Sequence, residues 1–256
     1  MQEILQGSDR ERPVTIGEEL GAPSLPLYEY ETLPSTSDGA RARLEAGERP
    51  PFALLARGQT AGRGRRGHSF FSPAGRGLYV TLALPVPAEE SIPLLTILAG
   101  TAALEAVEAR TGRRLMVKWV NDLFYNGKKA GGILAERRPE GILIGLGLNL
   151  QAGDFPPELA AIATDLDTDI DPAVLAEDFI RRCLAYVDAL PEQPFLSLYR
   201  ERSLAVGRTV TFRMNGETLE GRGLAIDEAG GLVVALPDGQ CRTLNSGEIS
   251  IRLEQD

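Results

Sequence analysis

The stretch Gly58-Gln-Thr-Ala-Gly-Arg-Gly-Arg-Arg-Gly67 places three arginines on a glycine-rich loop. The chain as a whole is acidic, with a formal net charge of -9. Nevertheless, no Asp or Glu occurs between Arg49 and Ala88, a segment that carries six arginines: Arg49, Arg57, Arg63, Arg65, Arg66 and Arg76. Glycine lets a backbone approach a ligand closely, and the planar guanidinium group fits carboxylate and phosphate. The stretch therefore predicts a loop that clamps a small anionic ligand.

The composition is that of an ordinary globular chain. Its 256 residues can bury a full core, and 43% apolar and 25% charged residues are typical values. No secretory signal and no bilayer-spanning apolar stretch is visible. With one histidine and the isolated Cys183 and Cys241, we expect a cytoplasmic protein with reduced thiols and no bound zinc. The acidic balance argues against bulk nucleic-acid binding.

Periodicity and turn signals predict alternating strands and helices. Ser35-Thr36-Ser37 offers N-cap hydroxyls to a helix near 38–47, and a buried helix over 92–110 ends at Gly112. We expect strands at 52–56, 78–84, 114–119, 122–126, 129–137 and 142–149. Asn126-Gly127 predicts a hairpin. Residues 157–203 read as helical, with one apolar stripe that faces the core, formed by Leu175, Phe179, Cys183, Tyr186, Val187 and Leu190.

The residue pattern of the sequence changes from Gly207 onward. Short strands there are separated by turn signals at Asn215-Gly216, Gly230-Gly231 and Pro237-Asp-Gly239, a pattern typical of a small β-barrel. The N-terminal residues are polar, rich in proline and weakly periodic. We therefore predict an irregular extension over 1–27, a main domain over 28–205 and a β domain over 206–256.

Three familiar interpretations of the glycine–arginine loop fail. Gly62–Gly67 matches G-x-G-x-x-G, but no helix can start at the following His-Ser-Phe-Phe-Ser-Pro, and the next acidic residue is Glu89. No P-loop motif occurs in the chain. A Ser/His/Asp hydrolase would have to use His68, which lies inside the arginine loop, where the positive field opposes its protonation.

Three further strings combine polar groups with small residues. Lys118-Trp-Val-Asn-Asp122 offers an ammonium, an amide and a carboxylate at a strand end, although core packing and turn chemistry would also account for it. Lys128–Glu136 carries two lysines before Gly131-Gly132, and paired glycines weaken a strand unless another group must approach closely. Gly145-Leu-Gly-Leu-Asn149 repeats this arrangement.

In this order, the strings resemble the biotin protein ligases over about residues 30–252. The matching segments are Ser35-Thr36-Ser37, Gly62–Gly67, Lys118–Asp122, Lys129–Glu136, Gly145–Asn149 and Gly247–Arg252. Three positions depart from the family pattern: Ser37 replaces asparagine, Val120 replaces proline and Phe70 replaces the commoner tryptophan. None of these departures removes a charge that the chemistry needs. The resemblance does not include a DNA-binding N-terminal domain, so it implies the monofunctional type.

The resemblance implies an α+β fold: a mixed β-sheet backed by helices, of the type shared by class II aminoacyl-tRNA synthetases and biotin ligases, then a C-terminal SH3-like β-barrel. It also implies a biotin–[acetyl-CoA-carboxylase] ligase. The biotin carboxylate attacks the α-phosphate of ATP, pyrophosphate leaves, and a lysine of the biotin carboxyl carrier protein then attacks biotinyl-5′-AMP. Mg²⁺ is expected with ATP. The resemblance allows a homodimer, and we expect no DNA and no membrane partner.

Cations must offset the repulsion between the two anions that react. The resemblance implies catalytic roles for Arg63, Arg65, Lys118, Lys129 and Asp122, of which Asp122 would orient the incoming amine. It implies biotin contacts for Ser35, Thr36, Ser37, Gln59, Gly62, Arg63, Lys129 and Gly132. It implies ATP or adenylate contacts for Arg65, Arg66, Phe70, Asn121, Lys129, Asn149 and Arg252, and no protein-bound metal.

Two alternatives share parts of this pattern. A lipoate ligase has the same fold and adenylate chemistry, but the polar Ser35, Thr36 and Gln59 favour the ureido ring of biotin over a dithiolane. A non-catalytic biotin-binding module would be expected to lack Lys129 or the arginine loop, and both are present.

Overall fold

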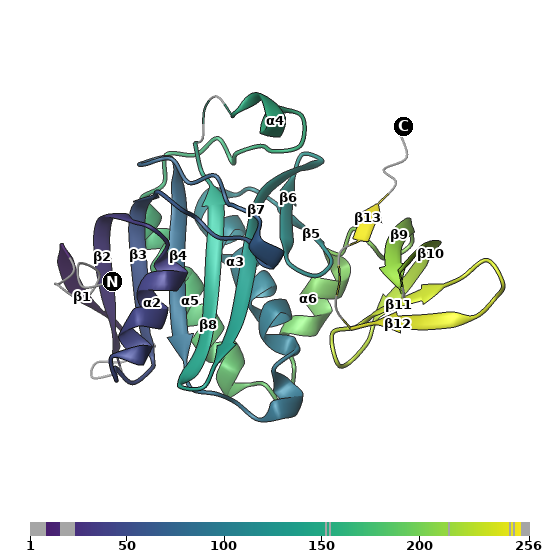
Figure 1. The fold of residues 1–256 in the computed structure, drawn as a ribbon, viewed down its shortest axis with the longest axis horizontal. Coiled ribbons are helices and arrows are strands. Elements are labelled where there is room, and N and C mark those ends of the chain that lie inside the picture. The colour runs from purple at the N-terminus through teal and green to yellow at the C-terminus, as the bar shows by residue number, and fades with distance from the viewer. Residues whose placement is uncertain are drawn as a thin grey trace.

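The computed structural model describes residues 9–15, 24–151, 153, 155–214, 216–245, 247 and 249–251. Within these residues an eight-stranded sheet and a five-stranded sheet stand side by side (Figure 1). The strands of the large sheet lie in the order β1 (Arg10–Thr15), β2 (Ser24–Leu33), β3 (Phe52–Gln59), β4 (Gly77–Leu84), β8 (Gly141–Asn149), β7 (Lys128–Arg138), β6 (Asp122–Tyr125) and β5 (Met116–Lys118). Only β2 and β3 pair in parallel, so the predicted mixed sheet is confirmed.

The central strands are apolar because both faces of the large sheet are covered. Alternate residues of β3 enter two different cores: Ala53 and Leu55 enter one, and Phe52, Leu54 and Ala56 enter the other. The first core lies under α3 (Leu94–Thr111) and α5 (Pro172–Asp188), and the second under α2 (Thr36–Glu45) (Figure 1). The expected helical backing of the sheet is thus confirmed.

The predicted helix over 92–110 is confirmed as α3, which ends at Gly112 in the left-handed conformation (φ 68°). Ser35 is the N-cap residue of α2, although its hydroxyl makes no cap hydrogen bond. Asn126 and Gly127 both adopt positive φ at the turn between β6 and β7, as the hairpin prediction requires. Two short 3-10 helices, η1 (Arg65–Gly67) and η2 (Glu89–Ser91), complete this part of the chain.

The prediction of helix over 157–203 is wrong for residues 161–171 and 189–194, which separate three helices. The chain forms α4 (Pro157–Ala160), then an extended segment, then α5 and α6 (Phe195–Glu201). Asp171 caps α5 by accepting a hydrogen bond from Ala173 N, and a residue that precedes proline, as Asp171 does, disfavours the helical conformation. The apolar stripe of α5 is buried or packs against the core as predicted.

The prediction of an irregular N-terminal extension is also wrong for its described part. Arg10–Thr15 forms the edge strand β1, which pairs antiparallel with β2 and buries Val14. Pro13 is tolerated because an edge strand has a partner on one side only. Residues 1–8 and 16–23 lie outside the described part of the chain.

The small β-structure predicted after Gly207 is confirmed as an antiparallel sheet. Its strands lie in the order β12 (Cys241–Leu244), β11 (Leu232–Ala235), β10 (Glu217–Ile226), β9 (Thr209–Met214) and β13 (Ile249–Ile251). Gly230 and Gly239 adopt positive φ at two of the predicted turns; Asn215, in the third, lies outside the described residues.

The two sheets share one continuous apolar core, which contains both Leu98 of α3 and Phe212 of β9. Trp119 Nε1 donates a hydrogen bond to Gly230 O across the junction at 3.0 Å. The domain boundaries predicted at 27/28 and 205/206 stay predictions. In the described part of the chain, no helix is both long and apolar enough to cross a membrane.

The paired glycines of β7 differ in what they contact, and this difference is testable. A Cβ on Gly131 would lie 2.4 Å from Gly147 O, whereas the nearest atom to a Cβ on Gly132 would be 3.5 Å away. We therefore expect Gly131→Ala to lower the free energy of unfolding by about 1–3 kcal/mol because it overpacks the contact with β8. Gly132→Ala, the matched control, should stay within about 0.5 kcal/mol of the wild type in urea unfolding. Equal losses in both variants would contradict this assignment.

Candidate active site

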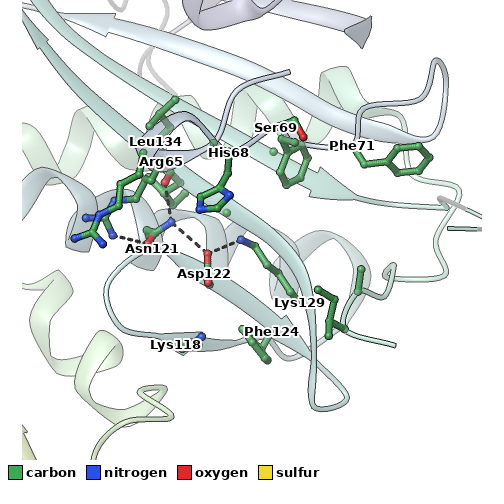
Figure 2. Close-up of a pocket in the computed structure, with 18 of the residues that line it drawn as sticks. Arg65, His68, Ser69, Phe71, Lys118, Asn121, Asp122, Phe124, Lys129 and Leu134 are labelled. Carbon is green, nitrogen blue, oxygen red and sulfur yellow. Dashed lines mark hydrogen bonds and ion pairs between the residues drawn. The ribbon is translucent and has the colours of Figure 1, made fainter. Parts of the chain in front are cut away.

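A cavity of about 1060 Å³ lies between the glycine–arginine loop, the turn from β5 to β6, and the second sheet. Most of the predicted site residues line it, and Figure 2 labels Arg65, Lys118, Asn121, Asp122 and Lys129 among them. These are Ser35, Thr36, Ser37, Gln59, Arg63, Arg65, Arg66, Phe70, Lys118, Asn121, Asp122, Lys129, Gly132 and Asn149. The structure therefore brings together residues that come from five separate stretches of the sequence.

Of the predicted residues that the structure describes, Gly62 alone is not part of this lining. Gly62 lies behind it, where a Cβ would be 2.4 Å from Ser72 Oγ and 2.5 Å from Phe70 O. Glycine is needed there so that the two sides of the loop can approach each other, which is a packing role. Arg252 lies outside the described residues.

The glycine–arginine loop folds back on itself. Phe70 N donates to Gly62 O at 2.8 Å, and Gly64 N donates to His68 O at 2.7 Å. Arg66 and Gly67 form the tip with positive φ values of 54° and 80°. This hairpin-like path directs the loop toward the cavity.

The arginines of the loop have different partners. The Arg63 guanidinium pairs with Glu136 on β7, at 2.9 and 3.2 Å, and with Asp38 on α2, at 3.0 Å. By contrast, Arg65 donates to Asn121 Oδ1 at 2.8 Å and to Gly247 O at 3.4 Å, which are uncharged acceptors. Arg63 is thus placed to anchor the loop to the main domain. Arg65 retains a positive charge that no described carboxylate pairs with.

Thr36, Ser37 and Gln59 line one end of the cavity, and a chain of hydrogen-bonded polar groups continues behind them through Ser72 and Thr81. Gln59 Oε1 accepts from the backbone N and the hydroxyl of Thr36, and Gln59 Nε2 donates to Ser72 Oγ at 2.9 Å. The fully buried Thr81 donates to Thr36 Oγ1 at 2.9 Å and lies 3.3 Å from Ser37 Oγ. The buried polar groups are thus mutually satisfied, which holds this end of the cavity in one shape.

Sequence reasoning missed Ser72 and Thr81. Thr81 could have been found as the one aliphatic hydroxyl within the apolar strand 78–84. Ser72 carries no comparable signal, because it becomes part of the site only when the loop folds back onto β3.

The string Lys118–Asp122 forms the tight turn that was predicted. Lys118 at the end of β5 and Asp122 at the start of β6 are backbone partners across the turn. The buried Trp119 points away toward the second sheet. The Trp119–Val120 peptide bond is cis. Tyr199 OH donates to Val120 O at 2.8 Å, and burial raises the pKa of this phenol well above its usual value, with the Asp122 charge adding to the effect. Tyr199 therefore remains a neutral donor that holds the turn in place.

A β-bulge places Lys129 in the cavity. Leu123 pairs with Gly131 and Phe124 with Lys129, so Ala130 is an extra, buried residue on β7. Without the bulge, Lys129 and Gly132 would face opposite sides of the sheet, because side chains alternate along a strand. With it, both line the cavity, and Lys129 Nζ lies 2.7 Å from Asp122 Oδ1 (Figure 2).

The extended segment between α4 and α5, residues 161–171, supports the side of the cavity where Lys129 and Asn149 lie. Lys129 N donates to Ile162 O at 2.9 Å, and Thr164 N donates to Lys129 O at 2.9 Å. Asn149 Nδ2 donates to Thr164 O at 3.0 Å, so the same segment orients Asn149. This contribution falls within the region wrongly predicted to be helical.

The ring of Phe70 packs against Gly147 of β8. A Cβ on Gly147 would be 2.6 Å from the Phe70 ring, so only glycine lets the ring approach this closely. Tyr79 packs edge-on at 6.4 Å between ring centroids. Phe70 therefore offers an aromatic surface at the side of the cavity where Asn149 lies.

The cavity is strongly positive within an acidic protein. Its lining contains the cations Arg63, Arg65, Arg66, Lys118, Lys128, Lys129 and Arg213, and among the described lining residues the only carboxylate is Asp122. The chain has just three lysines, and all three line this cavity. Such a surface favours ligands that carry more than one negative charge.

The second sheet closes part of the cavity through Thr211, Phe212, Arg213, Thr218, Gly247, Ile249 and Ser250. Of these, Gly247, Ile249 and Ser250 belong to the string Gly247–Arg252 that the sequence analysis singled out. His68 lines the cavity, but among the described residues its imidazole makes no hydrogen bond with a nucleophile or a carboxylate that would form a triad. The described residues contain no group of three His, Cys, Asp or Glu side chains that could hold a metal ion.

Comparison with known families and proteins agrees with this architecture. Residues 32–149 match the biotin/lipoate A/B protein ligase family, and residues 205–252 match the biotin protein ligase C-terminal domain. The chain is 32% identical to the bifunctional ligase/repressor BirA of Bacillus spizizenii, over 82% of this chain and 70% of that protein. It is 30% identical to the biotin–[acetyl-CoA-carboxylase] ligase of Paracoccus denitrificans, over 73% of this chain and 85% of that protein.

Solved structures give the same result. The biotin protein ligase of Aquifex aeolicus in complex with biotin and ATP superposes with a TM-score of 0.76 at 26% identity, over 88% of this chain and 98% of that chain. The ligase of Leishmania major in complex with biotinyl-5-AMP superposes with a TM-score of 0.60, also at 26% identity, over 85% and 98% of the two chains. The cation-lined cavity, the two-sheet fold and these similarities together establish that the chain belongs to the biotin protein ligase family.

Proposed function

We propose that this protein activates biotin with ATP to biotinyl-5′-AMP and transfers the biotinyl group to a lysine of a biotin carboxyl carrier protein. The observation that carries the proposal is a single cavity that joins a closed polar end to a cluster of cations around one carboxylate. Two anions, a carboxylate and a triphosphate, must meet in this reaction. Such a cavity supports their encounter by offsetting charge and by positioning both groups.

The polar end suits the ureido ring of biotin. Thr36, Gln59 and Thr81 form a connected network whose hydroxyl and amide groups can both donate and accept. Ser35 and Ser37 lie beside this network and are buried. Gly132 leaves open space near Asp122 and Lys129, where the valeryl carboxylate would meet the phosphate.

The cationic part suits the phosphates and the adenylate. Lys129 and Lys118 are the groups we assign to the charge that develops on the α-phosphate and on the leaving pyrophosphate, and Arg65 is the group we assign to retaining the adenylate. Phe70 and Asn149 lie on the side where we place the adenine. The Arg63 guanidinium is paired with two carboxylates, so we assign it to loop anchoring in preference to the catalytic role and the biotin contact that the resemblance implies.

Mg²⁺ would enter with the nucleotide. Asp122 is the only carboxylate among the described lining residues, which is too few for an ion held mainly by the protein. Mg²⁺ commonly keeps several waters and binds substrate phosphates with one or two carboxylates. When bound, it would neutralise part of the triphosphate charge.

The partners and the cellular location of the protein follow from the proposed activity. We propose a carboxylase carrier domain as the acceptor, a cytoplasmic location, and a homodimer, and the net charge of -9 disfavours DNA as a partner. Asp122, at the start of β6, is the group we assign to the incoming amine of the carrier lysine.

A lipoate-type ligase is the second candidate, because the matched family includes both activities. The polar lining around Gln59 favours biotin, since a ureido ring can hydrogen-bond with the amide and hydroxyl groups there and a dithiolane ring cannot. The deciding experiment incubates the protein with ATP, Mg²⁺, a carrier domain and either labelled biotin or labelled lipoate. Label on the carrier from biotin alone supports the proposal; label from lipoate, or from neither acid, contradicts it.

The first prediction concerns Lys129. Lys129→Ala should slow biotinyl-AMP formation by about 30- to 1000-fold, which corresponds to about 2–4 kcal/mol of lost charge stabilisation. Pyrophosphate release in a single turnover measures this step. Arg137→Ala, an exposed cation on the same strand that pairs with Glu89, is the matched control and should retain the wild-type rate.

The second prediction concerns Arg65, which bridges the loop, Asn121 and the second sheet. Arg65→Gly should still form biotinyl-AMP but release it faster, because the loop loses its contacts across the cavity. Biotinylation of a bystander protein such as serum albumin reports this release. Arg57→Ala, on β3 outside the cavity, should not increase bystander labelling. Equal labelling by Arg65→Gly and the wild type would refute the closing role.

The third prediction tests the anchoring role of Arg63. Glu136→Gln removes the charge that pairs with two Arg63 nitrogens, so the loop should be cut several-fold faster by trypsin at its three arginines. Mass spectrometry of the first fragments gives the cleavage rate at each site. Glu140→Gln, an exposed acidic residue in the turn after β7, is the control. If both variants are cut at the wild-type rate, the pairing does not hold the loop.

A further inference from the structure

Asp122 is occupied by a lysine of the protein itself. Lys129 Nζ lies 2.7 Å from Asp122 Oδ1, and Asn121 Nδ2 donates to the same oxygen at 3.2 Å (Figure 2). The proposed function needs this carboxylate for the amine of the carrier lysine, and it needs Lys129 at the reacting carboxylate and phosphate. Both roles cannot be filled while the two side chains are paired with each other.

The surroundings of Lys129 allow its side chain to move while its backbone stays in place. Its backbone N and O are both hydrogen-bonded to the segment after α4. Its side chain is 40% exposed within the cavity, and Gly132 presents no side chain between the two partners. Rotation about the side-chain bonds would therefore carry the ammonium from Asp122 toward an anion without any change in the sheet.

We propose that Lys129 changes partners during the reaction and thereby orders the two half-reactions, an inference that rests on the proposed function. In the empty protein, Lys129 pairs with Asp122 and the carboxylate is closed to a second ammonium by like-charge repulsion. When biotin and ATP bind, their negative charges attract Lys129, and Asp122 becomes free. The ammonium group of a carrier lysine can therefore bind Asp122 only after biotinyl-AMP has formed.

The chemistry of the second step makes this order useful. The carrier amine must be neutral when it attacks the acyl carbon of biotinyl-AMP. A C–N bond forms, the C–O bond to the phosphate breaks, and AMP leaves with the bonding electron pair. Before the attack, the Asp122 carboxylate accepts one proton from the carrier ammonium and passes it to solvent. The second proton leaves the nitrogen for solvent after the C–N bond has formed. Asp122 serves as acceptor only when Lys129 does not cover it.

The chain offers an unusually direct test because it contains only three lysines. Reductive methylation with ¹³C-formaldehyde would give three lysine signals and one α-amino signal by NMR, assigned with Lys→Arg variants. We expect the Lys129 signal to shift in Asp122→Asn without ligand. It should also shift in the wild type when a non-hydrolysable biotinyl-AMP analogue is added. Asp169→Asn, an exposed acidic residue after α4, should leave the signal unchanged.

Separate assays of the two half-reactions complete the test. Asp122→Asn should form biotinyl-AMP within about threefold of the wild-type rate but transfer it to the carrier at least 100-fold more slowly. The transfer deficit should shrink as the pH rises toward 10, because a larger fraction of carrier lysine is then neutral without help, given an unperturbed lysine pKa of about 10.4. A purely structural defect would not recover in this way.

The outcomes separate this inference from the proposed function. If the wild type forms no biotinyl-AMP, the proposed function is wrong. If it does, but the Lys129 NMR signal shifts neither with the analogue nor in Asp122→Asn, the exchange of partners is refuted. Equal losses of adenylate formation and transfer in Asp122→Asn would refute it as well.

Discussion

Repulsion among like charges is the constraint on which the site depends. Seven cations line one cavity, and such a cluster would spread apart unless each group were held by its own partner. The structure supplies partners of different kinds. Arg63 is held by two carboxylates, Arg65 by an amide and a backbone carbonyl, and Lys129 by a single carboxylate. The kind of partner separates the cation that anchors the loop from the cations that remain available to a ligand.

The walls of the cavity are rigid and hold its charged groups in fixed positions. Tyr199 and Trp119 hold the turn that carries Asn121 and Asp122, and both are buried with their polar atoms hydrogen-bonded to backbone carbonyls. Glycines of β7 and β8 let strands and the Phe70 ring approach more closely than any side chain would permit. Because the walls are fixed by packing, the charge of the site meets a ligand with little reorganisation, which is the usual source of electrostatic catalysis.

The second sheet is part of the site as well as an appendage of the fold. It shares the apolar core with α3, receives the Trp119 hydrogen bond, and contacts Arg65 through Gly247. A ligand in the cavity would therefore touch both sheets. This arrangement couples the closure of the glycine–arginine loop to a segment more than 180 residues further along the chain.

The sequence by itself determined the family, the mixed sheet, the small C-terminal β-structure and most of the cavity lining. Clustered arginines and lysines repel one another and paired glycines weaken a strand, so these residues at those spacings indicate a bound anion. It also determined the Gly112 cap and the Asn126-Gly127 hairpin, since local backbone conformation decides both. Only the tertiary structure decided the rest. The bulge at Ala130 reverses the face of Lys129, the folded loop recruits Ser72, and the segment after α4 leaves the helical conformation to hold Lys129 and Asn149. Each of these depends on hydrogen bonds between residues far apart in the chain, which no local pattern encodes.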